Sequence, residues 1–266
     1  MKIWTFWEPP EKMPVYIQMC METWKKFLPG VEIISLNLRN LSEYVDMGIC
    51  MEKLLAGMTG EGPLYKWPHV GDAVRAMLLE KYGGIWFDCD TVVLNSNAAN
   101  YFSNDKYEVI AFGDPADRQA RICNISAVPH ARLMRFWAKA VQWKILNFNP
   151  TTKFFWSYLG NSIVDPYVKT FDEEIFIHDM TPQMPELEFA ENGTRGYLDF
   201  YFFKRLHLKD ISSDMLLLHN SWTPDIFKVA NFNELMYFGC TLANILFEVL
   251  EIDRSHIKDF LFFEQD

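Results

Sequence analysis

The chain has 266 residues, of which 50% are hydrophobic and 16% aromatic, and its formal net charge is −10. This length suits one large α/β domain, and the high apolar content supports a sizeable core, which argues against a disordered chain. The negative charge argues against a general nucleic-acid-binding protein, although a metal ion or a helix end can still create a local site for an anionic ligand.

Predicted strands and helices alternate along the first half of the chain. Strands are expected at 3–7, 31–36, 85–87, 107–112 and 122–128, and helices at 14–28, 41–58, 72–82 and 129–146. The second half predicts a helix at 152–164, strands at 174–177 and 215–218, a helix at 232–250, another at the C-terminal end, and an irregular stretch at 182–196. This order favours an α/β fold with a mostly parallel sheet flanked by helices, and additional helices in the C-terminal half. Because no repeat, low-complexity segment or clear linker interrupts the sequence, we expect a single domain over residues 1–266.

Cysteine usage and the apolar stretches indicate a reducing compartment. The five cysteines are an odd number and form no CxxC pair, so neither a disulfide framework nor a cysteine zinc site is expected. The opening MKIWTFWEPP lacks the apolar stretch and small-residue cleavage site of a signal peptide. The longest apolar stretch, residues 235–247, is too short to span a membrane. The sequence therefore predicts a soluble cytoplasmic protein.

Two carboxylates follow the apolar strand predicted at 85–87. Asp88 and Asp90 are two residues apart, and side chains at that spacing point the same way on an extended chain. Ligands of open α/β sheets bind at the C-terminal ends of strands, where Mg²⁺ or Mn²⁺ can combine carboxylate oxygens with water and substrate phosphates. A metal that holds a diphosphate is one interpretation of this pair. The other is a turn in which one Asp caps a backbone NH.

Other polar and aromatic residues suit a sugar nucleotide, each with a structural alternative. Asp72 and Arg75, three residues apart on a predicted helix, form either an ion pair at the helix start or hydrogen bonds to a polyol such as a sugar. His219 follows a predicted strand and is either a structural histidine or a metal ligand, with Ser221 and Trp222 beside it. The aromatic side chains of the first strand are either buried or available to stack on a nucleobase.

A family resemblance rests on residues 71–94, GDAVRAMLLEKYGGIWFDCDTVVL. This stretch resembles the sugar-binding DxD glycosyltransferases of family 32, of the capsular-polysaccharide and yeast mannosyltransferase type, and is similar to the catalytic domains of clostridial glucosylating toxins. The family pattern there is Asp, Arg three residues later, a leucine-rich helix, Gly-Gly, an aromatic strand and DxD. Weaker similarity covers IWTFW, CNISAVPHARL and HNSW. Trp4 departs from the pattern, since relatives often carry His at that position.

The resemblance implies a GT-A fold and a hexosyltransferase that uses a nucleotide sugar, commonly a UDP-sugar, with Mn²⁺ or Mg²⁺ and retention of anomeric configuration. It implies a glycan or lipid-linked oligosaccharide acceptor, in surface or capsular polysaccharide synthesis. Implied metal ligands are Asp90, His219 and, directly or through water, Asp88. Implied donor contacts are Trp7 with the base, Asp72, Arg75 and Asn124 with the sugar, Asp88 with the ribose, and Ser221 and Trp222 with the diphosphate. The catalytic candidates are Asp72, Asp88 and Asp90.

Two other functions fit parts of the pattern. A metal-dependent phosphohydrolase would use Asp88 and Asp90 but would leave Asp72 and Arg75 without a role. A non-catalytic nucleotide-sugar-binding protein would bind the donor and transfer nothing.

The helix predicted at 129–146 leaves a further choice open. It interleaves basic residues with aromatic ones, namely Arg132, Arg135, Lys139 and Lys144 with Phe136, Trp137 and Trp143. Such a helix is either a core helix with a solvated basic face or a peripheral contact with an anionic membrane.

Overall fold

The computed structural model describes residues 1–56, 66–103, 106–148, 155–171, 174–183 and 193–263. The chain divides into two compact units. The first unit consists of Met1–Glu11, Val31–Asp88 and Asn100–Asp179, and the second of Lys12–Gly30, Cys89–Ala99 and Met180–Asp266. The division falls inside the DxD motif, between Asp88 and Cys89. Each unit is therefore described separately.

The first unit is built on a six-stranded sheet with the order β2-β1-β3-β6-β5-β7. Its strands are β1 (Lys2–Phe6), β2 (Glu32–Leu36), β3 (Gly84–Phe87), β5 (Val109–Asp114), β6 (Gln119–Ala127) and β7 (Ile175–Asp179). β6 runs antiparallel to both of its neighbours, and the other pairs are parallel. The predicted α/β class with a mostly parallel sheet is thus confirmed.

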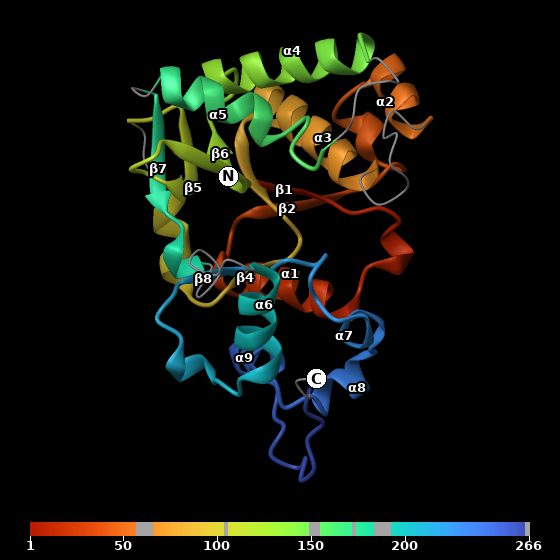
Figure 1. The fold of residues 1–266 in the computed structure, drawn as a ribbon, viewed down its shortest axis with the longest axis vertical. Coiled ribbons are helices and arrows are strands. Elements are labelled where there is room, and N and C mark those ends of the chain that lie inside the picture. The colour runs from red at the N-terminus through yellow and green to blue at the C-terminus, as the bar shows by residue number, and fades with distance from the viewer. Residues whose placement is uncertain (57–65, 104–105, 149–154, 172–173, 184–192, 264–266) are drawn as a thin grey trace. The chain divides into compact units, whose positions relative to one another are not determined.

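Helices pack against one face of this sheet, as Figure 1 shows for the first unit. α3 (Lys66–Tyr82) and α5 (Asn161–Thr170) contact the strands, and α2 (Gly48–Leu55) and α4 (Arg132–Leu146) pack on α3. Trp4 of β1 and Trp86 of β3 are paired in register, and both lie in the apolar core together with Trp137 of α4. Because alternate strand residues face opposite sides, this core fixes which side chains of β3 point toward the helices.

The second unit contains a two-stranded antiparallel sheet of β4 (Thr91–Val93) and β8 (Met215–Leu217). Its helices are α1 (Val15–Phe27), α6 (Gly193–Leu198), α7 (Asp225–Val229), α8 (Phe232–Met236) and α9 (Thr241–Val249), and a π-helical turn, Asp199–Phe203, follows α6. α1 is tied to β4 by two hydrogen bonds: the Trp24 indole donates to the Thr91 carbonyl (2.7 Å), and the Val93 amide donates to Thr23 Oγ1 (2.9 Å). These bonds hold the chain just after Asp90. β4 was not predicted from the sequence.

Three helices begin at places that the sequence did not indicate. The helix expected at 41–58 is a 3-10 helix, Leu41–Glu43, followed by α2, because the Gly48 amide bonds the Asp46 side chain (2.9 Å) and Gly48 has a φ of +43°. α3 begins six residues before the expected start, with Pro68 in its first turn, where no amide donor is needed. The expected 152–164 helix begins only at Asn161, and its residues 152–154 lie outside the described part.

The prediction of a single helix at 232–250 was wrong, and so was the prediction of a helix at the C-terminal end. The Gly239 amide donates to the Leu261 carbonyl (2.8 Å), and the Leu261 amide donates to Tyr237 (2.7 Å). This pairing with a distant segment interrupts the helix between α8 and α9. It also keeps the described C-terminal residues, 250–263, in turns and one β-bridge. Most of the irregular stretch expected at 182–196 lies outside the described residues.

Among the described residues, no helix combines the length and the apolar character needed to cross a membrane.

Candidate active site

The C-terminal ends of β1 and β3 lie at the same edge of the first-unit sheet, because the two strands are parallel neighbours. Trp7 follows β1 and Asp88 follows β3. Trp7 is half-buried, its backbone amide donates to Leu36 (3.0 Å), and its buried indole NH has no hydrogen-bond partner within the described residues. The predicted contact of Trp7 with the base stays a prediction.

Asp88 is held by two side-chain donors that meet on one oxygen. Arg75 Nη2 lies 2.6 Å from Asp88 Oδ1, and the Trp86 indole nitrogen lies 2.7 Å from the same atom. The Asp88 amide donates to the Cys123 carbonyl at 2.9 Å, and its side chain is 34% exposed. Since both bonds use Oδ1, Oδ2 is the oxygen available to a ligand.

Arg75 is 5% exposed, and its guanidinium group forms hydrogen bonds with other protein groups. Nη1 donates to the Ile122 carbonyl (2.8 Å), Nη2 bonds Asp88, and the guanidinium carbon lies 4.7 Å from the Trp86 ring centroid. The buried Nε has no partner in the described part of the chain. Arg75 therefore orients Asp88, and its predicted contact with the sugar stays a prediction.

Asp72 is 8% exposed and lies beside Arg75, with Oδ1 at 3.7 Å from Nη1. Burial raises the pKa of the Asp72 carboxyl to about 7; Arg75 lowers it in part, and Asp88 raises it. A Cβ atom placed on Gly160 would lie 2.8 Å from Asp72 Oδ2, so Gly160 packs directly on this carboxyl group. Asp72 is thus a near-neutral titrating group in the first unit.

Asn124 lies on β6, opposite Phe87 of β3, and is fully buried. Its predicted contact with a sugar stays a prediction. Trp86 and Gly160 were not identified from the sequence. The signal for Trp86 was its place two residues before Asp88, since that spacing puts both side chains on one side of the strand.

In the second unit, Asp90 is bonded to the segment that carries His219. The Leu218 amide donates to the Asp90 carbonyl (3.1 Å), and the Asn220 amide donates to Asp90 Oδ2 (3.0 Å). The His219 ring stacks on Trp222, with 4.1 Å between ring centroids. The structure therefore brings Asp90, His219 and Trp222 together, while Ser221 is exposed in the same loop.

Buried tyrosines fix this loop, which we call the 219–223 loop. The Tyr16 hydroxyl of α1 donates to Asn220 Oδ1, and the Tyr197 hydroxyl of α6 lies 2.8 Å from Thr223 Oγ1. Burial raises the pKa of both phenols, so the hydroxyls stay protonated and can donate. Neither tyrosine was identified from the sequence, because their partners are distant in the chain.

Carboxylate and imidazole donors fit a divalent cation that keeps water or phosphate oxygens as its other ligands. Asp90 and His219 offer such donors in the second unit, and Asp88 offers one in the first. Within the described residues, no group of three or more His, Cys, Asp or Glu side chains is gathered for a metal. The metal ligation predicted for Asp88, Asp90 and His219 therefore stays a prediction.

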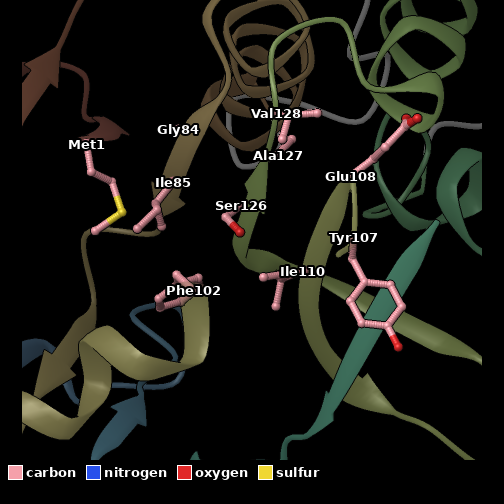
Figure 2. Close-up of a pocket in the computed structure, with 10 residues that line it drawn as sticks. All are labelled: Met1, Gly84, Ile85, Phe102, Tyr107, Glu108, Ile110, Ser126, Ala127 and Val128. Carbon is pink, nitrogen blue, oxygen red and sulfur yellow. The ribbon is translucent and has the colours of Figure 1, made fainter. Parts of the chain in front are cut away.

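A cavity of about 170 Å³ lies elsewhere in the first unit, near the start of β3 and β5 (Figure 2). Ile85, Ile110 and Phe102 give it an apolar wall, and Ser126 and Glu108 are its polar members. Glu108 is already paired with Arg132. None of the predicted site residues lines this cavity.

Solved structures of glycosyltransferases resemble the chain. One acts in glycosylation of the major capsid of PBCV-1 (TM-score 0.41, 14% identity, covering 67% of this chain and 81% of that one). Another is the PaToxG glycosyltransferase, with a TM-score of 0.41 and 15% identity, covering 70% of this chain and 70% of that one. A third is the glycosyltransferase GlyE of Streptococcus pneumoniae TIGR4, with a TM-score of 0.44 and 10% identity, covering 96% of this chain but only 61% of that one.

No curated protein matches the sequence significantly. The model of the family described as "Capsular polysaccharide synthesis protein" matches residues 1–168, which is more than half of the chain. The chain therefore belongs to the capsular polysaccharide synthesis protein family, the glycosyltransferase type that its sequence predicts.

Proposed function

We propose that the protein is a metal-dependent, retaining glycosyltransferase that moves a sugar from a nucleotide-sugar donor, a UDP-sugar, to a glycan acceptor in surface or capsular polysaccharide synthesis. The observation that carries the proposal is the arrangement of Asp88, whose Oδ1 is fixed by Arg75 and Trp86. A carboxylate held by two donors at the end of a parallel strand is preorganised to bind through its other oxygen. Membership of the capsular polysaccharide synthesis family supports the same reading.

Asp90, His219 and Asp88 are the proposed ligands of Mn²⁺ or Mg²⁺, with Asp88 bound directly, through water, or engaged by the ribose. When bound, the cation would neutralise charge that develops on the departing diphosphate. The Asn220 amide, 3.0 Å from Asp90 Oδ2, restricts the orientation of that carboxylate. The exposed Ser221 and the ring of Trp222 would lie against the diphosphate.

The donor's other parts would meet residues of the first unit. The half-buried Trp7 would stack on the base, and its unpaired indole NH would find an acceptor in the nucleotide. Asp72 would accept hydrogen bonds from sugar hydroxyls when it is ionised. Asn124 and Arg75 are both buried, and they would contact the sugar from the interior side of the site.

The proposed acceptor is a glycan or a lipid-linked oligosaccharide, reached in the cytoplasm at the inner face of a membrane. A donor panel tests the reaction: the protein is incubated with UDP-, GDP- and CMP-sugars, with Mn²⁺ or with EDTA, and nucleotide release is measured with and without oligosaccharide. We expect one donor to turn over only with Mn²⁺.

The same panel separates the other two functions. Phosphate release from simple phosphate esters, without turnover of any nucleotide sugar, would make the protein a phosphohydrolase. Calorimetric binding of a nucleotide sugar without turnover, with or without oligosaccharides, would make it a binding protein. Either result would overturn the proposal.

A further inference from the structure

The outer side of α4 carries basic and apolar side chains in one stripe. The inner side of the helix is buried in the first-unit core, through Leu133, Met134, Trp137, Ala138, Val141 and Ile145. The opposite side exposes Arg135, Phe136, Lys139, Trp143 and Leu146, which we call the outer α4 surface. Their spacing of three, four and seven residues places them along one face of a helix. In Figure 1, α4 lies at the outer side of the helix layer of the first unit.

The apolar members of this surface are unusually exposed. Trp143 is 66% exposed, Phe136 45% and Leu146 44%. The Phe136 ring lies 5.0 Å from that of Tyr167, which lies 4.7 Å from that of Phe171, and Phe171 is 51% exposed. A single exposed apolar side chain is ordinary, but several on one helix face, one of which contacts a ring of a second helix, mark an interaction surface.

The charge of the surface is opposite to that of the chain. α4 has four basic and no acidic residues among its fifteen, whereas the whole chain has a net charge of −10. Two of the four basic residues are engaged elsewhere, since Arg132 pairs with Glu174 (2.5 Å) and Lys144 bonds the Tyr158 carbonyl (2.7 Å). Arg135 and Lys139 remain as exposed cations between the apolar side chains.

We propose that the outer α4 surface binds an anionic lipid bilayer. Trp143 suits the interface between headgroups and acyl chains, where an apolar ring with one polar NH is favoured. Arg135 and Lys139 can extend to anionic headgroups while their methylene groups lie beside the apolar row. This inference does not depend on the transfer reaction.

Vesicle sedimentation tests the inference. The intact protein is mixed with vesicles of phosphatidylcholine alone or of phosphatidylcholine with phosphatidylglycerol, and the bound fraction is measured at low and high salt. We expect binding only to the anionic vesicles, weakened by salt because the charges are screened. The double variants Arg135→Glu/Lys139→Glu and Phe136→Ser/Trp143→Ser should each reduce binding about tenfold or more.

Matched variants in the second unit serve as controls. Lys209→Glu/Lys258→Glu reverses two exposed lysines, and Ile226→Ser/Val229→Ser replaces side chains that are 60% and 80% exposed. Both controls should bind anionic vesicles like the unchanged protein. All four variants alter exposed side chains, so their thermal unfolding midpoints should stay close to that of the unchanged protein.

Three results would overturn the inference. One is failure of the unchanged protein to bind anionic vesicles, and another is normal binding by both outer α4 surface variants. The third is a change of mass in solution for Phe136→Ser/Trp143→Ser without loss of vesicle binding, which would make the surface a contact between protein copies.

Discussion

At the scale of single residues, Asp88 owes its orientation to Arg75 and Trp86. The Trp86 indole NH is a neutral donor to the Asp88 carboxylate. Hydrogen bonds of this kind, with one charged partner, contribute about 1.5–3 kcal/mol to stability. We expect Trp86→Phe to raise the KM for the nucleotide sugar about tenfold or more, and to lower stability because a buried indole ring is replaced by a smaller one. Steady-state kinetics on the donor identified by the panel measures this.

Trp4→Phe is the matched control for that variant. Trp4 pairs with Trp86 in register, lies in the same core, and donates its indole NH to the Gly83 carbonyl (2.8 Å). Its replacement should lower stability and leave the KM unchanged. An equal rise of KM in both variants would show that the Trp86 effect is general loosening of the core.

Asp72 gives stability a specific pH dependence. Its pKa is raised from 3.8 to about 7 in the folded protein, so between these values the unfolded chain has released a proton that the folded protein still binds. Its contribution to stability is therefore fully present below pH 3.8 and is lost as pH rises through about 7. We expect the unfolding free energy of Asp72→Asn, relative to the unchanged protein, to increase from pH 5 to pH 8 in urea titrations. Parallel pH profiles would contradict this.

At the scale of elements, the 219–223 loop depends on α1 and α6. Tyr16 and Tyr197 each bond this loop through a hydroxyl, whereas the hydroxyl of Tyr201, also fully buried, has no hydrogen-bond partner among the described residues. Tyr16→Phe and Tyr197→Phe keep the rings and remove the bonds. We expect each to weaken Mn²⁺ binding severalfold in calorimetry, because His219 belongs to the loop and the Asn220 amide of the loop bonds Asp90.

Tyr201→Phe is the control for these two variants, since it removes a hydroxyl that serves no loop residue. It should bind Mn²⁺ normally and unfold at the same or a higher temperature, because an unpaired buried polar group is unfavourable. Unchanged Mn²⁺ affinity in Tyr16→Phe and Tyr197→Phe would show that the loop keeps its conformation without the tyrosines.

Gly160, the residue before α5, lies against the carboxyl group of Asp72 in the first unit. A Cβ at Gly160 would approach Ile122 Cδ1 at 2.7 Å and Asp72 Oδ2 at 2.8 Å, whereas a Cβ at Gly71 of α3 meets no atom within 4 Å. We expect Gly160→Ala to lower stability by about 1–3 kcal/mol and to reduce turnover. Gly71→Ala should be neutral or stabilising by up to about 1 kcal/mol. Chemical denaturation measures the unfolding free energy of both variants. Equal stability of Gly160→Ala and Gly71→Ala would contradict the close contact between Gly160 and Asp72.

At the scale of the whole chain, local patterns predicted most strands and the central helices. β1, β3 and α1 follow from short runs of apolar periodicity and from Pro or Gly at their ends. The division of the 232–250 helix was not predictable in this way, because it depends on backbone bonds from Leu261 to Tyr237 and Gly239. The single domain expected over 1–266 stays a prediction beside the two compact units.

The site divides similarly into predictable and unpredictable parts. The types and spacing of Asp72, Arg75, Asp88 and Asp90 were visible in the sequence. Arg75 as the partner of Asp88 was not, since thirteen positions separate them and only the fold joins helix and strand. Tyr16 lies 204 positions from Asn220, so no local signal could identify that bond.

We propose that Asp88 and Asp90, the two carboxylates of the DxD motif, bind a cation together with the donor. Calorimetric titration of Mn²⁺ in the presence of the nucleotide sugar, on the unchanged protein, Asp90→Asn and the distant control Asp210→Asn, tests it most directly. We expect Asp90→Asn to lose Mn²⁺ binding and donor turnover while it unfolds normally, and Asp210→Asn to bind Mn²⁺ like the unchanged protein. Normal Mn²⁺ affinity and normal turnover in Asp90→Asn would contradict it.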